Sequence, residues 1–213
     1  MADHFDVFHA LEHDKKERII DAALEEIALK GFKKASTNAI VEAAGISKGT
    51  LFYYFGSKEA LFDFLCDYTI EFAKREYIAK IEERVKIGDF IERYSILTEI
   101  KRNVMNEYPK IIKFYESFFL PGNEEYFAKY IETIKEQREN IAKSLYGDID
   151  YSLFRDGIEP EKALQYIGWL IERYEKELTQ NMFAGGGLDS EAYEEKFDEF
   201  KAFLNDLKRA FYK

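Results

Sequence analysis

Apolar side chains recur at intervals of three and four residues along almost the whole chain, which is the spacing of amphipathic helices. Glycine, proline and serines suited to helix capping divide this pattern into segments. The pattern predicts helices over 15–30, 38–44, 48–54, 58–86, 89–120 with an interruption at Pro109, 124–146, 160–182 and 190–211, with turns at Pro121-Gly122 and at 185–187. No segment shows the alternation typical of a strand, so the sequence predicts an all-α fold of about nine helices.

Composition narrows the class of protein. The chain has 213 residues, of which 46% are hydrophobic, enough for a sizeable core, and its single cysteine, Cys66, excludes an intrachain disulfide framework. No apolar run approaches the roughly 20 residues of a membrane helix, and residues 1–16 lack the apolar centre of a signal peptide. The three histidines, His4, His9 and His13, have no neighbouring cluster with metal-site spacing. We therefore expect a soluble cytoplasmic protein without a metal or other cofactor.

The net charge of −10 is unevenly distributed. Residues 14–60 carry eight basic and seven acidic side chains, and within 47–58 the only charged side chains are Lys48 and Lys58. Only the groups that touch a polyanion displace its counterions, so this local balance is compatible with DNA binding.

Two short predicted helices flank the turn Gly45-Ile46-Ser47, which is the spacing of a helix-turn-helix motif over about 37–56. In such a motif the second helix enters the DNA major groove. The residues suited to DNA contact carry a hydroxyl or ammonium group or permit close approach: Thr37, Lys48, Gly49, Thr50, Tyr53, Tyr54 and Lys58. Each also has a purely structural interpretation, with the hydroxyls as helix caps, one of the two tyrosines as packing and the lysines as solvated charges.

The stretch from Arg18 to Leu65 resembles the DNA-binding domain of the TetR (tetracycline repressor) family of bacterial transcriptional regulators. The matching pieces are IIDAALEEIALKGF at 19–32, STNAIVEAAGISKGTLFYYF at 36–55 and SKEALF at 57–62. The resemblance implies an all-α homodimer with an N-terminal three-helix DNA-binding domain, over 13–73 here, and a larger ligand-binding and dimerisation domain, over 74–213. It places the usual DNA contacts of the family on Thr37, Ser47, Lys48, Gly49, Thr50, Tyr53, Tyr54 and Lys58.

The chain departs from the family pattern within the second helix of this motif. Many members have Tyr-Tyr-His-Phe where this sequence has Phe52-Tyr53-Tyr54-Phe55. Phe52 has no hydroxyl, so any phosphate contact at that position is lost. Tyr54 replaces an imidazole with a longer phenol, which can alter the choice of base or phosphate.

The last two predicted helices carry heptad-like seams of apolar residues. The first seam consists of Leu164, Ile167, Ile171, Tyr174 and Leu178, and the second of Tyr193, Phe197, Phe200, Leu204, Leu207 and Phe211. Either the two helices form a hairpin buried in their own chain, or they pair with their copies in a second subunit as a four-helix bundle. We favour the bundle because Tyr166, Trp169 and Leu170 give the first helix another apolar face, which leaves one face for the core and one for a partner.

The resemblance also implies a small-molecule effector in the C-terminal domain. Large aromatic side chains and two arginines between 90 and 174 are the candidates for its pocket: Arg102, Phe114, Tyr115, Phe118, Phe119, Tyr126, Phe127, Tyr130, Tyr166, Trp169 and Arg173. Alternatively, most of these residues simply fill the core. A mostly apolar cavity with phenol hydroxyls suits a lipophilic or aromatic molecule. Arg102 or Arg173 can meet an anionic group, and the surrounding acids can meet a lipophilic cation.

The sequence thus predicts a ligand-responsive repressor that binds palindromic double-stranded operator DNA as a homodimer and is released by a small lipophilic or aromatic effector. Two recognition helices must then reach successive major grooves, about 34–36 Å apart, and the helix over 58–86 is the natural lever between the domains. The alternative is a helical ligand-binding or scaffold protein without DNA-binding activity. An enzyme is not expected, because the chain shows no nucleophile–base pair and no paired Glu-x-x-His motifs.

Overall fold

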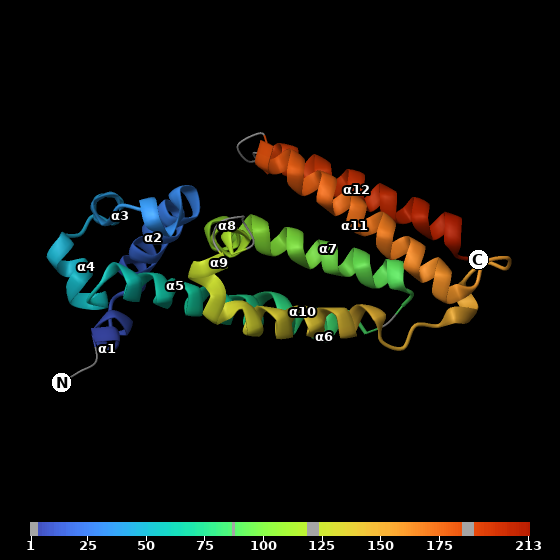
Figure 1. Cartoon of the computed structure of the whole chain (residues 1–213), viewed down its shortest axis with the longest axis horizontal. Helices are drawn as coiled ribbons and strands as arrows, with labels where there is room; N and C mark the ends of the chain where they lie inside the picture. The colour runs from blue at the N-terminus through green and yellow to red at the C-terminus, as the bar shows by residue number, and fades with distance from the viewer. Residues whose placement is uncertain (1–3, 87, 119–123, 185–189) are drawn as a thin grey trace. The chain divides into compact units, whose positions relative to one another are not determined.

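The computed structural model describes residues 4–86, 88–118, 124–184 and 190–213 (Figure 1). Within these ranges the regular structure is helical apart from one isolated antiparallel bridge between Phe154 and Tyr212, so the all-α prediction is confirmed. The predicted turns at Pro121-Gly122 and at 185–187 and the candidate Phe119 lie outside the described residues, as does the side chain of Tyr193.

The helices follow the predicted segments with finer divisions. They are α1 (His4–His9), α2 (His13–Lys34), α3 (Thr37–Ala44), α4 (Lys48–Phe55), α5 (Lys58–Phe72), α6 (Ala79–Arg84), α7 (Phe90–Glu107), α8 (Pro109–Ser117), α9 (Glu124–Phe127), α10 (Ile131–Tyr146), α11 (Pro160–Ala184) and α12 (Ser190–Phe211). A π-helical segment (Ala73–Ile78) lies between α5 and α6, and 3₁₀ turns are formed by Ala128–Tyr130 and Tyr151–Leu153. The sequence did not predict α1.

The chain packs as two compact units. The first unit consists of Met1–Tyr77 and Glu107–Arg138, and the second of Ile78–Asn106 and Glu139–Lys213. The predicted DNA-binding segment 13–73 lies within the first unit, which also includes a segment that is distant in sequence. The functional division at residue 73 stays a prediction.

The core of the first unit forms where the apolar faces of its helices meet. On α2 the buried residues recur at helical spacing: Ile19, Ile20, Ala22, Ala23, Leu24 and Ile27. Ile40 of α3, Leu51 of α4 and Leu65 of α5 are at most 1% exposed. Fully burying such a side chain contributes about 1.5–3 kcal/mol, so this core holds α3 and α5 on α2, and α4 on α3 and α5.

The second unit contains a helical hairpin, in which α11 and α12 lie side by side (Figure 1). Six of the predicted seam residues are at most 8% exposed within the single chain: Leu164, Ile167, Ile171, Phe200, Leu204 and Leu207. Tyr174, Leu178, Phe197 and Phe211 are half-buried. The prediction that these six residues form the interface between subunits is therefore wrong, because they pack in the core of their own chain.

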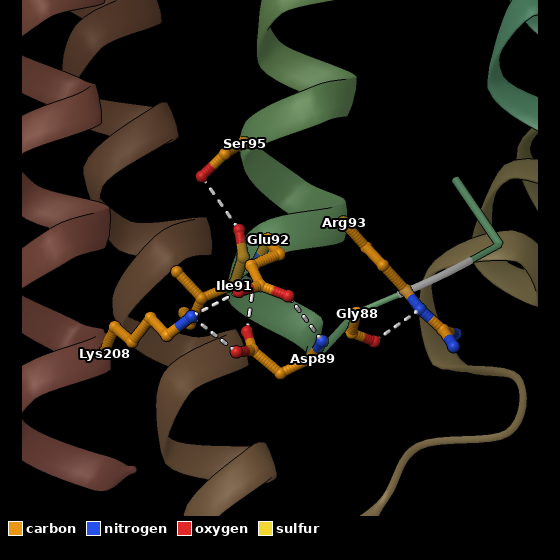
Figure 2. Close-up of polar contacts among 7 residues, drawn as sticks. All are labelled: Gly88, Asp89, Ile91, Glu92, Arg93, Ser95 and Lys208. Atoms are coloured by element: carbon orange, nitrogen blue, oxygen red, sulfur yellow. Dashed lines mark hydrogen bonds and ion pairs between the residues drawn. The ribbon is translucent and has the colours of Figure 1, made fainter. Parts of the chain in front are cut away.

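A polar network holds the start of α7 against α12 (Figure 2). Asp89 Oδ1 accepts a hydrogen bond from the Glu92 backbone N–H at 3.0 Å, and the Glu92 carboxylate accepts one from the Asp89 backbone N–H at 3.1 Å. Lys208 Nζ lies 2.8 Å from Asp89 and 2.6 Å from Glu92. Buried Arg93 donates to the Gly88 carbonyl at 3.1 Å. This reciprocal cap and its lysine fix where α7 begins.

Candidate DNA-binding site

Three successive helices of the first unit begin at a serine cap. Ser36, Ser47 and Ser57 each accept a hydrogen bond from the backbone N–H three residues further on, at 3.4, 3.1 and 3.0 Å. Such a cap satisfies an otherwise unpaired donor and is worth about 1 kcal/mol. The starts of α3, α4 and α5 are therefore fixed, and with them the side chains in the first turn of each helix.

The turn between α3 and α4 depends on Gly45. Its φ of 66° and ψ of 38° are left-handed values, which glycine adopts without the strain that a Cβ would bring. The Gly45 N–H donates to the Glu42 carbonyl and the Ile46 N–H donates to the Val41 carbonyl, which closes α3. Ser47 follows at once and opens α4, so the segment has the predicted helix-turn-helix geometry.

The outer face of α4 consists of Lys48, Gly49 and Tyr53. Lys48 and Gly49 are exposed, and Tyr53 is 55% exposed. The fold does not require a glycine at position 49, since a Cβ there would meet only Ser47 Oγ, at an ordinary 3.8 Å. Glycine costs about 0.8–1.0 kcal/mol relative to alanine inside a helix. Helix stability therefore does not explain glycine at position 49, which exposes the backbone of α4 beside the ammonium group of Lys48.

The remaining predicted contact residues lie at helix starts and have contacts within the chain. Thr50 Oγ1 lies 2.8 Å from Ser47 Oγ, so the two hydroxyls are linked. Lys58 Nζ lies 4.8 Å from the ring centre of Phe32 and donates to a backbone carbonyl at the end of α2 at 3.3 Å. Thr37 is half-buried as the first residue of α3. DNA contacts by these groups would add to or replace the internal ones.

Tyr54 does not lie on the outer face. It is 5% exposed, and its hydroxyl accepts a hydrogen bond from Lys15 Nζ at 3.4 Å. Its ring centre is 5.7 Å from that of Phe8. This burial contradicts the predicted contact of Tyr54 with a base or phosphate, and of the two tyrosines Tyr53 is the exposed one.

The structure adds a support for α4 that the sequence analysis missed. Phe8 of α1 is fully buried, and its ring centre lies 4.8 Å from that of Phe55 and 5.2 Å from that of Phe64. A six-residue helix has too few turns for a periodic signal, so only the apolar residues among the charges of the first segment hinted at it. α1 therefore packs against α4 on the side that faces the core.

A carboxylate holds the junction of α2 and α3. Glu26 is half-buried, accepts a hydrogen bond from the Ser36 backbone N–H at 2.9 Å and lies 2.9 Å from Lys30 Nζ. Burial raises the pKa of Glu26, but the Ser36 hydrogen bond and the Lys30 charge together lower that pKa below its ordinary value. The negative charge is thus compensated next to the start of α3.

The predicted effector residues of the first unit form a packed aromatic cluster. They are Phe114, Tyr115, Phe118, Tyr126, Phe127 and Tyr130. Phe114, Phe118 and Tyr130 are at most 7% exposed, and the ring centres of Phe118 and Phe127 are 4.1 Å apart. The Tyr130 hydroxyl donates to the Asp63 backbone carbonyl at 3.2 Å. These contacts favour the alternative in which the aromatic residues fill the core.

The other predicted effector residues belong to the second unit. Arg102 lies 3.6 Å from Glu194, and Arg173 lies 2.5 Å from Glu177, so both guanidinium groups are paired with carboxylates. Tyr166 is 38% exposed and Trp169 is 57% exposed. Of the four, only Trp169 lines the cavity of about 430 Å³ found in this unit.

None of the helices in the described ranges combines the length and the apolar character that a bilayer span requires. Among the same residues, His, Cys, Asp and Glu form no group of three or more that could hold a metal ion.

The capped helix with its exposed lysine, glycine and tyrosine, placed after a tight turn, defines a helix-turn-helix DNA-binding protein. Residues 19–64 match the family model described as bacterial regulatory proteins, tetR family. The HTH-type transcriptional regulator QacR of Staphylococcus aureus is 31% identical over 145 residues, which cover 67% of this chain and 70% of that protein. The chain belongs to the TetR family of transcriptional regulators, which are not enzymes.

Two further comparisons define the extent of the likeness. The uncharacterized HTH-type transcriptional regulator YvdT of Bacillus subtilis is 51% identical over 47 residues, so the matched stretch is 22% of this chain and spans only 24% of that relative. The crystal structure of the regulator FadR from Bacillus subtilis, in complex with stearoyl-CoA, has a TM-score of 0.54 at 21% identity and covers 90% of this chain and 96% of that one. The match at 51% identity is therefore short, QacR matches two thirds of the chain at lower identity, and the fold is shared along most of the chain.

Proposed function

We propose that the protein binds a palindromic operator as a homodimer through α4 and represses transcription until a small effector releases it. The observation that carries the proposal is the outer face of α4, where an ammonium and a phenol flank a glycine that the fold does not need. Close approach of a DNA backbone gives Gly49 a purpose, and the N-terminus of α4 favours a phosphate.

The proposed contacts divide into positioning and reading groups. Lys48 and Tyr53 contact phosphates, which hold α4 in the groove without reading sequence. Thr50 lies in the first turn of α4 and reaches a base edge with its hydroxyl or methyl group. Thr37 and Lys58 contact flanking phosphates from the starts of α3 and α5. A regulator of bacterial transcription acts where the chromosome is, in the cytoplasm.

A homodimer follows from the geometry of DNA rather than from the seams. Two copies of α4 must reach grooves about 34–36 Å apart, so one copy makes only half of the contacts. Since six of the seam residues are buried in their own chain, we assign the subunit contact to the other apolar face of α11, formed by Tyr166, Trp169 and Leu170, of which Tyr166 is 38% and Leu170 is 43% exposed. Exposed apolar patches of this kind are typical of protein interfaces.

A small effector would act by binding one dimer shape more tightly than another, which changes operator affinity by the difference between the two. The complex of Bacillus subtilis FadR with stearoyl-CoA supports small-molecule binding on this fold but says nothing of the ligand of this chain.

The DNA-binding part is tested with Lys48→Ala and, as a control, Lys201→Ala, which changes an exposed lysine of the second unit. Operator duplexes are selected from a random pool, and affinity is measured by fluorescence anisotropy over a series of salt concentrations. Loss of one phosphate contact is expected to weaken binding to all sequences and to reduce the salt slope by about 1, whereas the control should match wild type. A helical scaffold protein predicts instead no salt-dependent affinity of wild type for duplex DNA.

A further inference from the structure

The cavity of the second unit has aromatic walls. It measures about 430 Å³ and is lined by residues of α7, the end of α10 and α11, among them Phe90, Tyr94, Tyr146 and Trp169. This volume lies within the range of small-molecule sites, about 300–1,000 Å³. Gly168 also lines it, and a Cβ at that position would lie 3.5 Å from the Tyr146 hydroxyl. A longer side chain at position 168 would therefore occupy the space that the glycine leaves open.

The same cavity is negatively charged. Glu161, Glu172 and Glu175 line it, and none of its described lining residues is basic. Within the described part of the chain, none of these three carboxylates forms an ion pair. Their charge also acts on Tyr146, because burial raises the pKa of its hydroxyl and Glu172 and Glu175 raise that pKa further. The cavity therefore lacks the positive charge that its carboxylates would attract.

The surroundings argue against an anion in this place. The two arginines that an anionic group would need, Arg102 and Arg173, are paired with Glu194 and Glu177 and do not line the cavity. Trp169 lines the cavity and is 57% exposed in the single chain, on the same face of α11 as Tyr166 and Leu170, so part of this exposed area faces the proposed subunit contact. An indole that lies beside carboxylates and open space is a good surface for a cation, since ammonium and related groups are attracted to its face.

We propose that this cavity binds an organic cation with an apolar or aromatic body, and that such a cation is the effector; the second half of this statement rests on the proposed function. The carboxylates attract the charge, and the aromatic side chains contact the body. Charge complementarity favours this occupant over a fatty anion, which would face three carboxylates, of which Glu161 and Glu172 are exposed and Glu175 is half-buried.

The test uses the full chain and two ions of the same shape and opposite charge, tetraphenylphosphonium and tetraphenylborate. Trp169 is the only tryptophan, so its fluorescence reports on the cavity directly. We expect a saturable change with the phosphonium ion and none with the borate. Replacing both carboxylates in Glu172→Gln with Glu175→Gln should weaken phosphonium binding about tenfold. Glu177→Gln, on the same helix but outside the lining, should leave it unchanged.

Several outcomes would overturn the cation site: equal binding of both ions, no saturable signal, or full affinity in the double variant. Duplex affinity, measured on the same preparations, separates this from the proposed function. A wild-type protein that binds DNA but no phosphonium refutes only the cation site. Bound phosphonium with unchanged DNA affinity refutes its role as effector. Loss of the dimer in the double variant, with no phosphonium bound by wild type, would refute the site by assigning the cavity to a contact between copies.

Discussion

Replacing Gly49 with alanine separates what the fold needs from what DNA binding needs. The added Cβ would lie 3.8 Å from Ser47 Oγ with no nearer atom outside the helix, and the backbone there is not in the left-handed region. Alanine is favoured over glycine by about 0.8–1.0 kcal/mol in a helix interior and by less at the second residue of α4. We therefore expect the free energy of unfolding to rise by about 0.5–1 kcal/mol.

The same methyl group is expected to weaken DNA binding. If a DNA backbone contacts the bare surface at Gly49, the methyl group takes that space and moves α4 outward, which lengthens the contact between Lys48 and its phosphate. Loss of one hydrogen bond between charged groups costs about 1.5–3 kcal/mol, or roughly a 10- to 150-fold drop in affinity. Stability and affinity should thus change in opposite directions in one variant.

Urea denaturation followed by circular dichroism measures the first quantity, and anisotropy with a selected operator duplex measures the second. Gly45→Ala is the contrasting variant, because its φ of 66° makes alanine strained and should lower the free energy of unfolding by about 1 kcal/mol. A Gly49→Ala protein that binds the operator as tightly as wild type would show that close approach is not the reason for the glycine.

Three other substitutions test the rest of the structure. Phe8→Ala removes a fully buried ring behind α4 and should lower the free energy of unfolding by about 3 kcal/mol in urea titrations. Phe8→Leu should recover part of this loss. An unchanged denaturation midpoint would mean that α1 does not pack on α4. The pKa of Glu26 is lower in the folded protein than its ordinary 4.5, so its charge stabilises the fold at neutral pH, and this stabilisation is lost as the pH falls through the lowered pKa. Glu26→Gln should therefore make the free energy of unfolding less dependent on pH in acid. A pH profile identical to that of wild type would contradict this. Leu170→Asp should give a folded protein that sediments as a monomer and binds the operator weakly. Phe200→Asp, which buries a carboxylate in the core, should instead unfold the chain. A stable dimer of the Leu170 variant would refute the assigned interface.

The elements that sequence reasoning located best are those with local signals at their ends. The cap Ser47 and the glycines at 45 and 56 bracket α4 in the printed sequence, and each acts through atoms within four residues of itself. α1 was not predicted because its stabilising contacts are with residues distant in sequence. Phe8 packs on rings of α4 and α5, and a short stretch of sequence around Phe8 does not include those rings.

The sequence located the apolar faces of the helices but not what each face contacts in the folded protein. The spacing of Ile167 and Ile171 is the same whether a hairpin closes on itself or on another subunit, so only the folded chain could assign it. Tyr53 and Tyr54 are adjacent and chemically identical, and Tyr54 was drawn inward by Phe8 and Lys15, which lie far from it in sequence.

The discontinuous first unit has a consequence for protein engineering. α8 packs on α2, with Lys110 Nζ 3.1 Å from Asp21, and Phe114 of α8 lies against Phe62 of α5, with 6.2 Å between their ring centres. A chimera that grafts only residues 1–77 onto a relative would strip these helices of their native neighbour. The exchangeable module must therefore include residues 107–138 as well. Because α8 contacts α2 directly, a displacement of α8 changes the packing of α2 even where α5 does not move.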